Sequence, residues 1–351
     1  RLGLLPAMPF GWMGSSLHVP EGLLQGFLGN LMDSLRDDGF SRVYLLTPQG
    51  LEWCSAGASD SISHWTSAWR IGLPGQPAPM DQLPSDCDRD KVILIPVGHI
   101  EQHGYHLPMS TDTLIIEAIS RGTASASNLT AATLPVMPYG VSTHRPSFAG
   151  TLNAGGRAFE DFWVGVIDAL AERGFDRFYF MSGHGGNGSF LTNVVKYSGE
   201  RHRRIFCATA PLYLTSPQGV AALEKYRCSG VGGMGHACEL ETSLVLHLKT
   251  ELVRMQDVVD ETDFVATPSY YMDWVEGGSL IANPPWDDDT TTGAYGAGSL
   301  ATAEHGRLWL EAAIAEKVGH VAEIHEQHCR REQRRQSGFG LWGKKAAYAS
   351  K

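Results

Sequence analysis

The hydrophobic pattern indicates an α/β fold over most of the chain. From Lys91 onward, short apolar runs alternate with longer stretches of helical periodicity, which is typical of a mainly parallel sheet with crossover helices. Strands are predicted at 92–97, 132–137, 177–181 and 204–210, and helices at 113–119, 158–173 and 189–197. Gly174 is placed to end the second of these helices. A long final helix at 298–330 is expected to be broken mainly by Gly306 and Gly319.

The first ninety residues differ from the rest but contain a weak internal repeat. Leu-Pro-Ala-Met-Pro-Phe-Gly at 5–11 parallels Leu-Pro-Val-Met-Pro-Tyr-Gly at 134–140, and Gly-Phe-Ser-Arg-Val-Tyr at 39–44 parallels Gly-Phe-Asp-Arg-Phe-Tyr at 174–179. The intervening lengths differ by six residues, and Gln49 stands opposite His184. We therefore expect a degenerate strand-helix-strand copy that packs against the active domain or a neighbouring subunit.

This repeat suggests three regions along the chain. Residues 1–87 would hold the degenerate copy and a Ser- and Pro-rich linker at 55–84, and residues 88–330 the domain that carries the chemistry. Residues 331–351 would form a loose basic tail. The cations near this end are interpreted as a solvated helix end: Arg330, Arg331, Arg334, Arg335, Lys344 and Lys345.

Composition and charge argue against several classes of protein. Hydrophobic residues make up 43% and charged residues 19%, as in ordinary globular domains. No stretch reaches the ~20 apolar residues of a membrane-spanning helix. The formal charge of −10 argues against a nucleic-acid-binding surface. Since Arg1 does not open a signal peptide and the six cysteines form no CxxC pair, we expect a cytoplasmic protein with reduced thiols.

The densest group of chemically active side chains follows the predicted strand at 92–97. It holds His99, Glu101, His103 and His106, and Asp112 begins the next helix. Ligands bind at the carboxyl ends of strands in open α/β sheets. Glu101 and His103 are two residues apart, so in an extended segment they project to the same side. Asp112 could bridge two cations or serve as a helix N-cap, but three imidazoles and two carboxylates together favour a metal site.

A glycine-rich segment with one histidine follows the predicted strand at 177–181. Met-Ser-Gly-His-Gly-Gly-Asn-Gly at 181–188 could cradle a phosphate at a helix N-terminus. The segment has neither a Walker lysine nor GxGxxG spacing. We therefore interpret His184 as a metal ligand at the strand end, with glycines that let backbone and substrate approach closely.

The third cluster, Gly-His-Ala-Cys-Glu-Leu-Glu-Thr-Ser at 235–243, leads into an apolar helical stripe. Glu241 lies three, four and seven residues before apolar positions, so on a helix it falls within the buried stripe. A carboxylate there needs a compensating charge, which a cation would supply. Glu239 points to the opposite helical face, where we expect solvent or an indirect role beside the metal.

These three motifs resemble the creatininase family. The resemblance rests on Glu-Gln-His-Gly-x-His-Leu-Pro at 101–108 followed by Asp112, Gly-His-Gly-Gly-Asn at 183–187, and His-Ala-x-Glu-x-Glu-Thr-Ser at 236–243. Pro-Tyr-Gly at 138–140, His144 and Phe-Ala-Gly-Thr at 148–151 agree, and the resemblance covers roughly 91–330. It implies a three-layer α/β/α domain with a mainly parallel sheet, usually a homo-oligomer, holding two divalent metal ions.

The resemblance also implies how the two metals would be held, with zinc expected and manganese or iron as alternatives. One metal would be bound by Glu101, Asp112 and His184, and the other by His103, Asp112 and Glu241.

Three positions depart from the family pattern. Family members that act on creatinine carry an acidic ligand inside the second motif, where this chain has Gly186. Glu241 is the expected substitute, which weakens the case for creatinine as the substrate. His99 and Cys238 replace the usual small residues and are expected to alter the substrate pocket.

The expected chemistry is hydrolysis of a C–N bond in a small cyclic amide, formamide or peptide-like compound. Two adjacent cations can acidify a bridging water and polarise a carbonyl. His236 is expected to carry a proton to the leaving nitrogen, because an imidazole titrates near neutral pH and the family places a catalytic histidine at this motif. The side chains expected to line the pocket are Tyr105, His106, Tyr139, His144 and Phe148.

Two other hypotheses remain open. A two-metal phosphoesterase or other non-amide hydrolase could use the same ion geometry. Because the N-terminal copy retains a scaffold without the ligands, the chain could instead be a catalytically silent structural subunit. Covalent catalysis has little support, since neither a GxSxG elbow nor a catalytic-cysteine signature is evident.

Overall fold

The computed structural model describes residues 5–12, 15–40, 43–47, 62–66, 83–144 and 147–338. Its central sheet has four parallel strands in the order β4-β3-β5-β6. The strands are β3 (Val92–Val97), β4 (Ala131–Thr133), β5 (Arg177–Ser182) and β6 (Phe206–Ala210). Every residue of β3 and β5 is buried, as expected for the central strands of a covered parallel sheet. The register places Val97 beside Ser182, so β3 and β5 end side by side.

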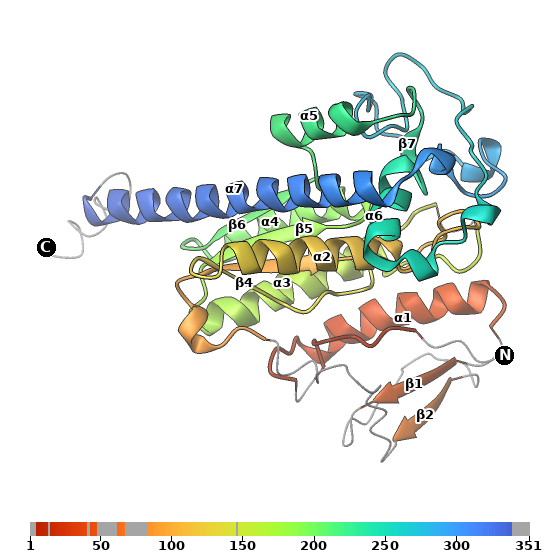
Figure 1. Cartoon of the computed structure of the whole chain (residues 1–351). Helices are drawn as coiled ribbons and strands as arrows, with labels where there is room; N and C mark the ends of the chain where they lie inside the picture. The colour runs from red at the N-terminus through yellow and green to blue at the C-terminus, as the bar shows by residue number, and fades with distance from the viewer. Residues whose placement is uncertain are drawn as a thin grey trace, which may run out of the picture.

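Helices cover both faces of this sheet. α2 (Thr111–Ala126) and α7 (Ala303–Gln336) cover one face, and α3 (Gly156–Glu172) and α4 (Gly188–Arg201) cover the other. α5 (Pro217–Tyr226) and α6 (Glu239–Lys249) pack against α7. Alternate β3 residues point to opposite faces. Ile93 and Ile95 belong to a core with α3 and α4, whereas Val92 and Leu94 belong to a second core with α2, α6 and α7. The predicted three-layer α/β/α fold is confirmed (Figure 1).

Two predicted elements differ in length from the observed ones. The strand predicted at 132–137 is only three residues long, and its regular pairing with β3 ends where the Leu134 N–H donates to the Leu94 carbonyl at 2.9 Å. Pairing resumes once beyond it, where Met137 bridges Val97. The helix predicted at 113–119 is longer and spans Thr111–Ala126.

The prediction that two glycines break the final helix is wrong. Helix α7 is continuous, and it begins at Ala303 because the Thr302 side chain accepts a hydrogen bond from the His305 N–H at 3.1 Å. Gly306 serves close packing instead, since a Cβ atom there would lie 1.9 Å from the Ser243 carbonyl oxygen of α6. Gly319 faces open space, so the helix accommodates it at its usual small cost.

The N-terminal segment contains α1 (Glu21–Asp37) and a parallel pair of strands, β1 (Val43–Thr47) and β2 (Ile62–Thr66). Helix α1 packs against α3, and the Phe27 and Phe162 rings lie 4.8 Å apart. Phe10 and Leu24 join the same core. The segment therefore packs against the main domain of its own chain, on the side of the sheet away from α7 (Figure 1).

Matching details support the predicted internal repeat. In the alignment α1 falls opposite α3, both helices have 17 residues, and both are followed by a glycine with positive φ, 85° at Gly39 and 92° at Gly174. The Val19 N–H bonds the Gly11 carbonyl at 3.1 Å, as the Ala154 N–H bonds the Gly140 carbonyl at 2.9 Å. Gln49 and most of the predicted linker at 55–84 lie outside the described residues, so the domain boundaries stay predictions.

The C-terminal end is helical further than predicted. Helix α7 continues to Gln336, supported by side-chain pairs such as Arg330 with Glu326, and Gly338 follows it with a φ of 74°. Residues 339–351 of the predicted tail lie outside the described residues. Among the described helices, none combines the length and apolar character needed to cross a membrane. The described cysteines Cys87, Cys207, Cys228, Cys238 and Cys329 are free thiols.

Candidate metal centre

The fold brings all five predicted ligands together. The first motif follows β3 and the second follows β5, and these neighbouring strands end at the same edge of the sheet. Helix α2 carries Asp112 in its first turn, and α6, which packs against α2, carries Glu241 in its own first turn. The five residues form two overlapping groups, each with ligand atoms within 4.8 Å of one another: Glu101, Asp112 and His184, and His103, Asp112 and Glu241. By the same distance, His236 forms a third group with Glu101 and His103.

Asp112 lies between the two imidazoles. Its Oδ1 is 3.1 Å from His103 Nε2 and its Oδ2 is 3.3 Å from His184 Nδ1. The alternative role as helix cap is excluded, because Ser110 occupies the N-cap position and Asp112 is the second residue of α2. One carboxylate thus offers one oxygen to each of two adjacent positions.

The orientation of each imidazole leaves one nitrogen available toward Asp112. His103 Nδ1 lies 3.1 Å from the Glu101 carbonyl oxygen, to which it can donate, and His184 Nε2 lies 3.0 Å from that of Val141. A histidine whose other ring nitrogen donates to a carbonyl is the usual arrangement of a metal ligand, because that bond fixes both tautomer and ring orientation.

The outer carboxylates complete the two groups. Glu101 Oε1 accepts a hydrogen bond from the Ser142 hydroxyl at 3.1 Å, and its Oε2 is 3.0 Å from His184 Nδ1. Glu241 Oε2 accepts the Ala237 N–H at 2.7 Å, while its Oε1 lies 3.9 Å from His103 Nε2. Glu101 Oε2 and Asp112 Oδ2 are buried and both face the same nitrogen, His184 Nδ1, without hydrogen-bond geometry. Such oxygens need a compensating partner, and a cation fits this donor set.

The buried carboxylates and imidazoles of the centre shift one another's pKa values. Burial opposes the charged form of His103, but Asp112 and Glu241 raise the pKa of its imidazole to about 9. Burial raises the pKa of Glu241 to about 7, assisted by the Asp112 charge and opposed by His103. The pKa of Glu101 is lowered despite its burial, since His184 and His236 favour the carboxylate. Glu241 is therefore the carboxylate of this cluster that takes up a proton most readily, whereas Glu101 stays ionised.

Gly186 occupies the position at which an acidic ligand is expected in family members that act on creatinine. A Cβ atom there would lie 2.3 Å from the Val141 carbonyl oxygen and 2.5 Å from His184 Nε2. The local backbone therefore leaves no room for a side chain. In this structure the second motif supplies one imidazole and no carboxylate, and Glu241 comes from α6.

His236 stands beside the five predicted ligands. It ends β7 (Met234–His236), which pairs antiparallel with β8 (Tyr295–Gly296). Its ring lies 4.2 Å from the His103 ring, and its Nε2 is 2.7 Å from the Gln102 carbonyl oxygen. Burial and the His103 charge lower the pKa of His236 to about 4. The imidazole is therefore neutral near pH 7 and can accept a proton.

Sequence reasoning missed Trp286. This buried residue begins a short 3-10 helix, and its ring stacks on His144 at 4.2 Å and meets the edge of His236 at 4.9 Å. Asn283 and Asp287 from the same loop accept hydrogen bonds from Thr143 and Ser147, each at 2.7 Å. The only feature of the sequence that could have indicated Trp286 is that a large aromatic residue follows two prolines within a polar stretch.

The structure separates the five predicted pocket residues. The His144 ring stacks on Trp286, which in turn contacts His236 of the candidate centre. Tyr105 is 55% exposed, and Phe148 is partly buried in a loop. His106 is buried with its Nε2 2.9 Å from the Thr242 hydroxyl, and Tyr139 is a core residue whose hydroxyl donates to the Pro6 carbonyl. The last two thus have protein partners, so their side chains contribute to packing.

Of the two alternatives expected for Glu239, exposure to solvent is wrong. Glu239 is completely buried, and its carboxylate accepts the backbone N–H groups of Cys228 at 2.9 Å and Ser229 at 2.8 Å. Opposite faces of α6 are both covered, one by α2 and the other by the loop before β7 and by α7. A helical pattern of apolar residues shows one buried face but does not show that the other is covered as well.

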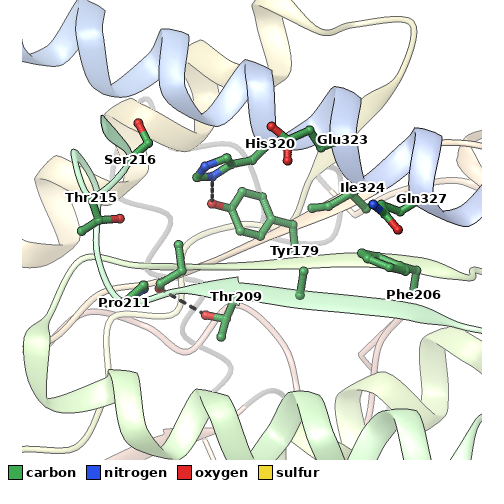
Figure 2. A pocket seen from close by; sticks show the side chains of 12 residues that line it. Tyr179, Phe206, Thr209, Pro211, Thr215, Ser216, His320, Glu323, Ile324 and Gln327 are labelled. Atoms are coloured by element: carbon green, nitrogen blue, oxygen red, sulfur yellow. Dashed lines mark hydrogen bonds between the residues drawn. The ribbon is translucent and has the colours of Figure 1, made fainter. Parts of the chain in front are cut away.

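A cavity of about 470 Å³ lies elsewhere in the molecule, between β6 and α7. Figure 2 shows Tyr179 and His320 pointing toward each other inside it, with Tyr179 Oη 2.7 Å from His320 Nδ1. None of the five predicted ligands lines this cavity. Its chemistry is therefore separate from the carboxylate and imidazole cluster.

Comparison with known proteins finds relatives in the same family that the three motifs resemble. A profile of the creatininase family, described as creatinine amidohydrolase, matches residues 79–321. The mycofactocin precursor peptide peptidase of Mycobacterium ulcerans (strain Agy99) is 30% identical over 248 residues, 69% of this chain and 87% of that protein. Creatinine amidohydrolase of Pseudomonas putida is 27% identical over 246 residues, 64% of this chain and 86% of that protein. The solved structure "Creatininase Mn" matches with a TM-score of 0.57 and 25% identity over 69% of this chain and 93% of that one.

The matched segment includes the four-stranded sheet and the three histidines of the site, His103, His184 and His236. The similarity therefore covers the elements that position the candidate centre as well as the general architecture. This chain belongs to the creatininase family.

Proposed function

We propose that this chain is a two-metal amidohydrolase that cleaves a C–N bond of a small cyclic amide, formamide or peptide-like substrate. The observation that carries the proposal is the position of Asp112, whose two oxygens face one imidazole nitrogen each, at 3.1 Å from His103 and 3.3 Å from His184. A shared carboxylate between two imidazoles is a suitable bridge for two cations.

The donor set favours zinc, with manganese or iron as alternatives, because mixed carboxylate and imidazole ligands suit all three. One ion would be held by Glu101, Asp112 and His184, and the other by His103, Asp112 and Glu241. When bound, the ions would polarise a carbonyl and acidify a water near neutral pH.

The chain's own residues orient the substrate and move the proton. His236 lies against His103 and its ring is fixed by the Gln102 carbonyl, a position from which the imidazole would take up a proton and pass it on to the leaving nitrogen. Trp286 packs on His236 and His144 and would exclude water from one side of the reacting bond.

Relatives and local structure both bear on the substrate class. One relative is named a peptide peptidase and another a creatinine amidohydrolase, and both names denote hydrolysis of a C–N bond. Gly186 has no room for a side chain, so the acidic ligand expected of a creatinine-specific centre has no place here. We therefore favour a substrate other than creatinine.

The proposal is tested by assaying the zinc- or manganese-loaded full chain against three sets of compounds: cyclic amides and formamides, short peptides, and phosphate esters. We expect hydrolysis within one of the first two sets, and its loss in Asp112→Asn. Asp161→Asn, an exposed acid on α3, is the matched control. Hydrolysis of phosphate esters alone, or no metal-dependent activity on any set, would contradict the proposal.

Assembly and location are predictions of the same proposal. We expect a homo-oligomer in the cytoplasm that acts on a small molecule without nucleic-acid or membrane partners. The formal charge of −10 supports the absence of a nucleic-acid surface.

A further inference from the structure

A separate group of side chains that could hold a metal ion lies outside the candidate centre. It consists of Cys228, Glu239 and His305, whose ligand atoms all lie within 4.8 Å of one another. Cys228 belongs to the loop between α5 and β7, Glu239 is the first residue of α6, and His305 is the third residue of α7. In Figure 1 these three segments come together near the right-hand end of α7.

The carboxylate at the middle of this group is held rigidly. Glu239 is completely buried, and the N–H groups of Cys228 and Ser229 donate to its two oxygens at 2.9 Å and 2.8 Å. These bonds also place the Cys228 side chain beside the carboxylate. The ligand pair is therefore positioned by the backbone before any ion arrives.

The imidazole faces this carboxylate without a hydrogen bond. His305 Nδ1 is buried, has no hydrogen-bond partner, and lies 3.9 Å from Glu239 Oε1. The ring is packed between Tyr226 and Trp309, with ring centroids 6.3 Å and 5.5 Å away. A buried polar nitrogen without a partner is costly, and a cation between it and the carboxylate would satisfy both.

The three donors are chemically suited to a soft or borderline cation. Zinc is bound by thiolate, imidazole and carboxylate, and thiolate selects against the hard cations magnesium and calcium. Cys228 is exposed, so an ion can enter from solvent. With three protein ligands, one position of a tetrahedron remains for water.

We propose that Cys228, Glu239 and His305 form a separate site for one thiophilic divalent cation such as Zn²⁺ or Cd²⁺. Binding would tie the loop before β7 to the first turns of α6 and α7. Glu239 lies two residues before Glu241, so the ion would stabilise the end of the helix that also carries a ligand of the candidate centre. The proposal does not depend on the catalytic function.

The test uses the reduced, metal-free full chain titrated with Cd²⁺, followed by the sulfur-to-cadmium charge-transfer absorption. The five residues of the candidate centre include no thiol, so cadmium bound by them gives no such band. We expect a saturable band in the wild type, its loss in Cys228→Ser, and its retention in Cys87→Ser, which removes another exposed thiol.

A second variant tests the imidazole. His305→Gln should weaken the affinity measured from the band by at least ~10-fold, because it removes a direct ligand. Its thermal unfolding without cadmium shows whether the variant is folded. A band that persists in Cys228→Ser, an unchanged affinity in folded His305→Gln, or no band in the wild type would overturn the proposal.

Discussion

The ability of the candidate centre to bind cations depends on the orientation of its carboxylate and imidazole side chains. Burial alone would make Glu101, Asp112 and Glu241 unfavourable, since each carboxylate is more than nine-tenths buried. What makes the arrangement suitable for cations is the pair of imidazoles, each held through one nitrogen by a backbone carbonyl. Removing one partner from such a cluster leaves the others uncompensated.

His236 gives a residue-scale prediction about catalysis. Since it lies beside the ligands and is proposed to move a proton, His236→Ala should lower kcat by about 10²–10⁴-fold. Its metal content should equal that of the wild type, because its neighbours supply the ligands. Steady-state kinetics and metal analysis on the same preparation check this. A variant with wild-type kcat, or one that loses its metal, would contradict the proposed role.

Glu261 gives a residue-scale prediction about pH and stability. Although partial burial opposes it, hydrogen bonds from Thr290, Thr292 and Thr291 lower the pKa of Glu261 from 4.5 to about 2. A carboxyl whose pKa is lowered on folding stabilises the protein above its unfolded pKa and loses this contribution as the pH falls toward its folded pKa. Glu261→Gln should therefore lower the unfolding midpoint at pH 6 and have little effect near pH 2.

Thermal unfolding as a function of pH measures this difference, with Asp263→Asn as the control, an exposed carboxylate two residues away. The Glu261 loop lies next to Gly293, whose carbonyl accepts a hydrogen bond from Gln102 at 3.0 Å. A gap between wild type and Glu261→Gln that is the same at both pH values would show that the carboxylate's charge is not responsible.

At the scale of elements, two glycines of one helix should respond oppositely to the same substitution. Gly306→Ala places a methyl group against the Ser243 carbonyl, so α6 and α7 must separate, at a cost of about 1–3 kcal/mol. Gly319→Ala meets open space on the helix surface and should stabilise by about 0.5–1 kcal/mol. Denaturant unfolding of both variants measures the difference. If the two changes have the same sign, the close α6–α7 contact is not as described.

The elements that could be predicted from sequence are those whose pattern is local. β3 and β5 have continuous apolar runs. Both ends of α3 could be placed within two residues, and its C-terminal end was indicated by Gly174. α5 was missed, although Ser216 caps it and Pro217 is its first residue, a recognisable start signal. The length of β4 could not be predicted, because it depends on which of its N–H groups face β3.

The same limit applies to the site. Residue type and motif order were enough to identify the five ligand candidates, since the ends of β3 and β5 had to meet at one sheet edge. Trp286 could not be found this way, because it reaches the centre on a long loop whose course is set by contacts with Thr143 and Ser147. The burial of Glu239 likewise follows from a loop that closes over α6.

At the scale of the whole molecule, the N-terminal segment covers a face of the domain that would otherwise be exposed. α1 packs on α3, and equivalent positions of the proposed repeat, Phe27 and Phe162, contact each other at 4.8 Å. Contact between equivalent residues is what an approximate two-fold relation between two copies produces. The contact between Phe27 and Phe162 therefore agrees with the proposed repeat.

A pair of ions shared through Asp112 can be counted on the purified protein. The measurement is the metal content of the purified full chain after loading with zinc and dialysis, in a Cys228→Ser background so that the separate thiol site contributes nothing. We predict about two ions per chain, and no more than about one in the same chain carrying Asp112→Asn. Fewer than two ions in the parent, or two in the Asp112→Asn chain, would contradict the account.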